Sequence, residues 1–213
     1  YTSETNAFLA QLPLIQEKVV DILRSSPADL VHAEVYLCMR VFLCRFASQH
    51  LTGFWPIILT EMVRILAQAK VDLPADKSDR LQLVFSVVKL ADFLITLQTD
   101  DFQIHQWLLI TDTPDATNPA SSYMADSLLD CLAKFVSECQ RELVFDANDS
   151  LERAQQRRPL LQMSSVATIS TLQPFFATAS RAFYQCDFHA TLDWDNINAC
   201  LLHDLFEPIH TNT

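Results

Sequence analysis

The chain has 213 residues, half of them hydrophobic, with one glycine and a formal net charge of −11. Phosphate-binding loops and tight hairpin turns need several glycines, so this composition excludes Rossmann and P-loop sites and argues against a sheet protein. The acidic balance argues against nucleic acid as a partner, because nucleic-acid binding requires a concentrated basic face. We therefore expect an all-α fold with no sheet, as a single helical domain over residues 1–213 that belongs to a longer protein.

Helical periodicity predicts about seven helices, which we expect to form a HEAT- or armadillo-like stack. The first helix covers about residues 5–25, and Pro13 either kinks it or marks its start. The second runs from about residue 31 to 47 and is apolar on nearly every side, so we expect it to be the central helix. The third begins near Thr52, the expected N-cap, and should be the antiparallel neighbour of the second.

A long helix is predicted at about 79–98, followed by a short one at 102–110 with Trp107 as its anchor. Its apolar stripe should be buried while its polar residues face water. Residues 111–122 and 146–160 are polar and are expected to be flexible, the latter as a linker. The residues expected to face water on the long helix are Gln82, Ser86, Lys89 and Thr96.

Three more helices are predicted near the C-terminal end of the sequence. They cover about residues 127–145, 164–185 and 193–206. Pro174 should kink or restart the second of these helices, because proline lacks the backbone donor of a helix interior. In the last helix we expect Trp194 to point inward with the other apolar residues, Ile197, Leu201 and Leu205.

The sequence holds no motif of a catalytic or metal site. Neither H-E-x-x-H nor G-x-S-x-G occurs, and no two cysteines form C-x-x-C. His32 and Glu34 are two positions apart on a helix and do not face each other. We therefore expect no metal, no cofactor and no enzymatic activity. The six cysteines, expected to be reduced, buried and structural in a cytosolic protein, are Cys38, Cys44, Cys131, Cys139, Cys186 and Cys200.

Two features are candidates for binding. Three arginines within six residues could hold a lipid phosphate, because a guanidinium offers two parallel donors; the alternative is a solvated loop, since acidic residues lie nearby. Trp55 or Trp107, if exposed, would be an interface anchor, whereas the alternative for both is the core. The candidate lipid-binding residues are Arg153, Arg157 and Arg158, with Lys134 and Arg141 on the preceding helix.

Several blocks of the sequence resemble the C-terminal region of the Dopey proteins, which are very large eukaryotic peripheral membrane proteins. The most specific block is residues 50–63, HLTGFWPIILTEMV, preceded by RVFLCR at 40–45. Further similar blocks follow in the same order at residues 89–94, 101–107 and 172–176. The residues that carry this signature are Leu51, Thr52, Trp55, Pro56, Thr60, Glu61, Met62 and Trp107.

The resemblance implies a peripheral scaffold on the cytosolic face of Golgi and endosome membranes. It implies two partners, a large Arf-exchange-factor-like scaffold and a phospholipid flippase. It also implies phosphoinositide binding of the PI4P type, although this chain has only Lys134 and Arg141 where those proteins carry a strongly basic helix.

Two functions are therefore weighed. The first is a non-enzymatic trafficking scaffold that acts through protein–protein contacts, with a phosphoinositide membrane and a second copy of the chain as further partners. The alternative is a lipid-handling helical protein with an apolar cavity between helices, which a pocket of about 300 Å³ or more would favour.

Overall fold

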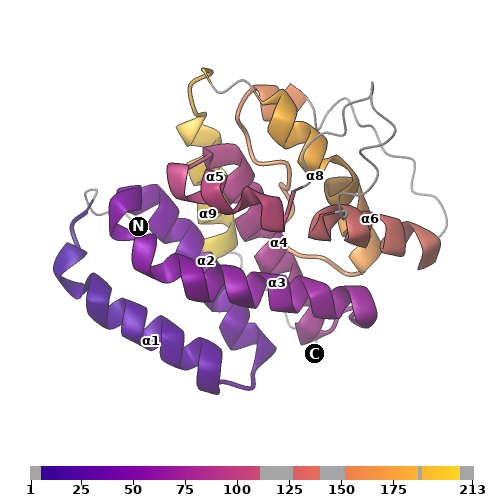
Figure 1. The fold of residues 1–213 in the computed structure, drawn as a ribbon, viewed down its shortest axis with the longest axis horizontal. Helices are drawn as coiled ribbons and strands as arrows, with labels where there is room; N and C mark the ends of the chain where they lie inside the picture. The colour runs from indigo at the N-terminus through magenta and orange to yellow at the C-terminus, as the bar shows by residue number, and fades with distance from the viewer. Residues whose placement is uncertain (1–5, 111–126, 140–151, 187–188, 207–213) are drawn as a thin grey trace.

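The computed structural model describes residues 6–110, 127–139, 152–186 and 189–206. This part of the chain contains helices and connecting segments but no strand, which confirms the predicted all-α fold (Figure 1). The predicted loop at 111–122 lies outside the described residues. The α-helices are α1 (Leu12–Ser25), α2 (Asp29–Arg45), α3 (Trp55–Val71), α4 (Asp79–Leu97), α5 (Asp100–His105), α6 (Leu128–Cys139), α8 (Gln173–Gln185) and α9 (Trp194–Phe206).

Short 3₁₀ turns lead into or follow several of these helices. They are η1 (Leu9–Gln11), η2 (Ser48–His50), η3 (Thr52–Phe54), η4 (Gln106–Leu108) and η6 (Ile169–Leu172).

The centre of the fold is α4, in which every residue from 81 to 97 is buried. Helices α2, α3 and α8 pack against it. The prediction that the second helix, α2, is central was therefore wrong: α2 exposes Val31 and Glu34 on its outer side. The predicted water-facing residues of α4, Gln82, Ser86, Lys89 and Thr96, are also buried, because distant segments of the chain cover this face.

The neighbour of α2 is α4, and the two helices run in the same direction. Asp29 at the start of α2 pairs with Arg80 at the start of α4, with the carboxylate and guanidinium 3.3 Å apart. Further along both helices, the guanidinium of Arg40 lies 5.4 Å from the ring centre of Phe93. The expected antiparallel pairing of the second and third helices is thus replaced, and α3 packs on α4 and α6.

Prolines mark the starts of three helices. Pro13, Pro56 and Pro174 stand in the first turns of α1, α3 and α8, where a missing N–H group leaves no hydrogen bond unmade. Pro174 therefore begins a new helix, which is one of the two outcomes predicted for it. Thr52 is not the N-cap of α3, because it lies in η3 and its hydroxyl reaches the Gln49 carbonyl at 3.5 Å.

One end of α4 is closed by a segment that we call the strap, residues 152–168. The guanidinium of Arg157 donates to the carbonyl oxygens of Thr96 and Leu97, at 3.3 and 3.0 Å, and to that of Ala190 at 3.1 Å. The last carbonyls of an α-helix have no partner within the helix. The strap supplies that partner here, and a positive charge at this end also complements the helix dipole.

The strap then runs back along α4 in the opposite direction. Both carboxylate oxygens of Asp92 accept backbone N–H groups of the strap, from Leu160 at 2.9 Å and Leu161 at 2.8 Å. Nearly three turns earlier in α4, the side-chain amide of Gln82 donates to the carbonyl of Val166 at 2.8 Å. Gln82 and Asp92 of α4 thus hydrogen-bond to the backbone of the strap.

The strap includes part of the segment that was expected to be a flexible linker. Residues 146–151 lie outside the described residues. Residues 152–160 are instead attached to α4 through the hydrogen bonds of Arg157 and Leu160, which the charged composition of this segment did not indicate.

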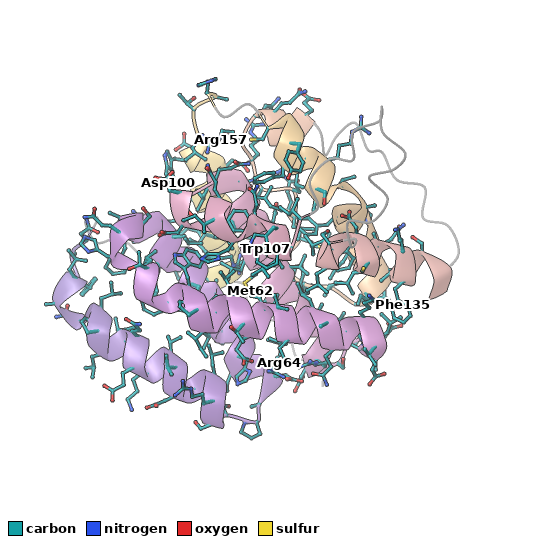
Figure 2. All side chains as sticks on the ribbon, in the orientation of Figure 1. Met62, Arg64, Asp100, Trp107, Phe135 and Arg157 are labelled. Carbon is teal, nitrogen blue, oxygen red and sulfur yellow. The ribbon has the colours of Figure 1, made fainter. Side chains whose placement is uncertain are left out.

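The contacts of Arg157 predict a cost in stability. Replacing Arg157 with Ala removes three charge-assisted hydrogen bonds, so we expect the free energy of unfolding to fall by about 2–3 kcal/mol. The measurement is the urea unfolding midpoint. Arg64→Ala is the matched control, because Arg64 is exposed and pairs only with Glu61 on its own helix, and it should change stability by about 0.5 kcal/mol or less. Figure 2 shows Arg64 well away from Arg157.

Equal effects of Arg157→Ala and Arg64→Ala would contradict the role of Arg157 in closing α4.

Candidate functional site

Three of the cysteines, Cys38, Cys44 and Cys200, are poorly suited to nucleophilic chemistry. Burial raises the pKa of the Cys38 thiol to about 11, and that of Cys44 also to about 11. Burial likewise raises the pKa of Cys200. A thiol with a raised pKa is protonated at neutral pH, and the thiolate is the reactive form. Within the described residues, no group of three His, Cys, Asp or Glu side chains could hold a metal ion.

The family-signature residues are divided between core and surface. Leu51, Trp55 and Met62 are buried, and the indole N–H of Trp55 donates to the Asp101 carboxylate at 3.2 Å. This bond joins two of the similar sequence blocks. Trp107 is 68% exposed, so the prediction that it anchors its short helix was wrong. Phe102, which is fully buried, is the anchor of this element because it points into the core.

The remaining signature residues have local roles in α3. The hydroxyl of Thr60 donates to the carbonyl of Pro56 at 2.6 Å. Glu61 pairs with Arg64, with 2.7 Å between the charged atoms. These contacts stabilise α3 locally, and they do not join Thr60 or Glu61 to a histidine or cysteine.

The three candidate lipid-binding arginines all lie on the strap, and each has an internal acceptor. Arg153 donates twice to the carbonyl of Pro159, at 2.7 and 3.0 Å. Arg158 pairs with Asp193 at 2.6 Å, and Arg157 binds the end of α4. The pKa of Asp193 is lowered by the backbone N–H of Asn196 and by this arginine.

The other two candidates lie elsewhere. Lys134 is exposed on α6, and Arg141 lies outside the described residues. The structure therefore groups the three arginines but does not place Lys134 with them. Lipid binding by this set stays a prediction.

The surface feature best suited to binding is an apolar groove of about 420 Å³ between α1 and α2. Helix α1 lies at one edge of the molecule, where it contacts α2 (Figure 1). The side-chain amide of Gln16 on α1 donates to the carbonyl of Gly53 at 2.7 Å. A Cβ at Gly53 would stand 2.5 Å from this amide, so a larger residue there would displace the end of the Gln16 side chain.

The groove has an apolar lining and one charged residue on each helix. Leu14 of α1 is 62% exposed and Val31 of α2 is 42% exposed, so large aliphatic side chains meet solvent here. Lys18 and Glu34 supply the charges. A contiguous apolar patch with a polar border is typical of a binding surface. The lining residues are Leu14, Ile15, Lys18, Val19, Ile22, Val31, Glu34, Val35 and Cys38.

Two further cavities are less apolar. One, of about 560 Å³, lies where the end of α2 meets Trp194 at the start of α9. Trp194 is 44% exposed, which corrects the prediction that it points inward, because its side chain lines this cavity. The other, of about 190 Å³, lies beside Asp204, Arg40 and Lys89.

No helix in the described part of the chain is, by itself, long and apolar enough to span a bilayer. Residues 79–97 and 100–108 meet that criterion only as a pair, bent by 115° at the break between them.

Asp92 predicts an unusual pH dependence of stability. Burial raises its pKa from 3.8 to about 6, although the N–H groups of Leu160 and Leu161 oppose this shift. Between these two values the folded chain binds a proton that the unfolded chain does not, so the contribution of this group to stability is lost as pH rises. Lowering the pH from about 7 to about 5 should therefore stabilise the protein through this group by on the order of 1 kcal/mol.

The measurement is urea unfolding of the wild type and Asp92→Asn at both pH values. The difference in their free energies of unfolding should change with pH in favour of the wild type as pH falls. A constant difference would contradict the raised pKa.

Comparison with known proteins identifies relatives over most of the chain. The model of the "DOP1 C-terminal" family matches residues 1–188. Protein DOP1B of Mus musculus is 28% identical over 217 residues, which covers 86% of this chain and 9% of the relative. Protein dop1 of Emericella nidulans is 32% identical over 130 residues, covering 58% of this chain and 7% of the relative.

Protein pad-1 of Caenorhabditis elegans is 29% identical over 151 residues, covering 65% of this chain and 6% of the relative. The chain thus spans 9% or less of the length of these relatives. No solved structure matches the chain significantly.

Proposed function

This chain belongs to the Dopey (DOP1) family, and from that premise we propose that it is a non-enzymatic scaffold domain in membrane trafficking that binds protein partners. The observation that carries the proposal is the apolar groove between α1 and α2. The names of the relatives denote no reaction, and the raised thiol pKa values work against cysteine chemistry.

The occupant that best fits the groove is an amphipathic helix of a protein partner. Such a helix places apolar residues along one face, which matches a long cleft between two helices. Lys18 and Glu34 border the groove with opposite charges, so a helix with an acidic and a basic residue at its own edges is complementary. Because Leu14 and Val31 are large and exposed, they would be covered by that helix.

The resemblance supplies the proposed partners and location. We propose that the groove receives the large Arf-exchange-factor-like scaffold, that a phospholipid flippase belongs to the same assembly, and that the domain works on the cytosolic face of Golgi and endosome membranes. A second copy of the chain is a further proposed partner. These proposals rest on the similarity to the Dopey proteins.

Phosphoinositide binding is proposed on the same basis, and the arginine contacts change how it must be tested. Charge reversal at Arg157 or Arg158 would break the strap, so a loss of binding there would report on folding. Lys134 is exposed on α6, outside the strap, so the thermal melt of its charge-reversal variant separates binding from folding.

We expect Lys134→Glu to reduce flotation with vesicles that contain phosphatidylinositol 4-phosphate by several-fold, because a positive charge near an anionic surface contributes about 1 kcal/mol. The thermal melt should stay within about 2 °C of the wild type. Lys70→Glu, at another exposed lysine near the end of α3, is the matched control. Equal flotation of both variants and the wild type would contradict a role for Lys134.

If the groove binds the protein partner, a single substitution in its lining should weaken that binding. Leu14→Asp places a charge on its apolar lining and should reduce co-precipitation of the Arf-exchange-factor-like scaffold by about tenfold or more. Val71→Asp is the matched control, because Val71 is 83% exposed and lies outside the groove. Both variants should keep the wild-type melting temperature, since neither side chain is in the core.

Equal capture by the wild type and Leu14→Asp would remove the groove as the binding site. Failure of the wild type to capture this scaffold would remove the proposed partner. The groove exceeds about 300 Å³ and is apolar, so it also fits the lipid-handling alternative. Binding of a fluorescent fatty acid that Leu14→Asp abolishes, without any protein partner, would favour that alternative.

A further inference from the structure

Helix α9 is seated on the core by a buried group of three charges. The carboxylate of Asp204 receives the guanidinium of Arg40 from α2 and the ammonium of Lys89 from α4. All three side chains are at most 7% exposed. The ring of Phe85 lies 5.0 Å from the Lys89 ammonium and shields it further from water.

We call the site that Arg40 of α2 and Lys89 of α4 form for this carboxylate the seat. The seat requires an anion. Two desolvated cations converge on it, and burial lowers the pKa of Lys89 while Asp204 raises it. If α9 left without a replacement, both cations would be buried without a partner, which is strongly unfavourable. The seat is therefore expected to exchange one carboxylate for another and not to stand empty.

The apolar residues of α9 that pack against the core are Ile197, Leu201 and Leu205. Ile197 and Leu201 are fully buried, whereas Trp194 and Phe206 at the two ends of the helix are 44% and 76% exposed. Asp204 completes a pattern of two apolar residues and one acid at positions i, i+4 and i+7, which share one face of a helix. A short pattern of this kind is easily supplied by another helix.

Two observations indicate that the seat can be considered apart from α9, the helix that occupies it. Arg40 and Lys89 lie within the family-matched residues 1–188, while α9 begins after them. The cavity of about 190 Å³ beside Asp204 is lined by Ser86 of α4 and Ser164 of the strap. This space would admit a longer acidic side chain with hydroxyl groups near its carboxylate, so the seat is not restricted to aspartate.

We propose that the seat on α2 and α4 is a recognition site for an acidic amphipathic helix of a protein partner. In the absence of the partner, α9 of the same chain occupies the site, and the partner helix replaces it. The partner helix presents two aliphatic residues and a carboxylate at the spacing of Ile197, Leu201 and Asp204. This site is separate from the α1–α2 groove, and its test does not depend on the partner proposed there.

The probe is a fluorescent peptide of residues 193–206, added to the full 213-residue chain. In the wild type, attached α9 competes at high effective concentration, so binding should be weak. In the Asp204→Asn chain the attached helix lacks its carboxylate, and peptide affinity should rise about tenfold or more. A peptide with the same Asp204→Asn change should not bind. Asp195→Asn is the matched control, since Asp195 is exposed on α9, and this chain should bind as the wild type does.

A second measurement uses the unaltered chain and so does not depend on a variant that folds. Excess wild-type peptide should increase amide hydrogen exchange in residues 194–206 of the chain, and the Asp204→Asn peptide should not. If neither peptide changes this exchange, α9 is a fixed part of the fold and the proposal is overturned. Equal binding of both peptides to the Asp204→Asn chain would overturn the carboxylate requirement.

Discussion

The other contacts of the fold depend on the burial of α4 from residue 81 to residue 97. An enclosed helix that carries Gln82, Lys89 and Asp92 must find a partner for each polar group, because an unpaired polar group in the core is unfavourable. The backbone of the strap hydrogen-bonds to Gln82 and Asp92, and a carboxylate of α9 pairs with Lys89. The packing of distant segments thus follows from the polar residues of one central helix.

This constraint also explains what became of the groups that looked functional in the sequence. Arginines can bind phosphate, but on the strap they hold backbone carbonyls and Asp193, so their charge is used within the fold. Cys38 and Cys44 keep their protons at neutral pH because burial raises the pKa of both thiols. What remains for binding is apolar surface and charge at the periphery, which is the character expected of a scaffold.

The two proposed binding surfaces differ in the interaction that would drive binding. The α1–α2 groove is open, and its exposed Leu14 and Val31 gain from being covered. The seat of α9 is closed, and its buried cations demand an anion whichever helix provides it. The first surface would therefore gain a partner by burial of apolar area, and the second by exchange of one charged helix for another.

Helical periodicity, composition and sequence motifs were sufficient to predict the all-α class, the family, most helix positions to within a few residues, and the prolines that begin α1, α3 and α8. These features depend on local periodicity and backbone chemistry, which neighbouring residues encode. Only the packing of distant segments encloses α4 and not α2, gives the strap arginines their acceptors within the fold, and leaves Trp107 exposed. Whether a polar or aromatic side chain is buried depends on partners more than 60 positions away, such as Leu160 for Asp92, and helical periodicity carries no information about them.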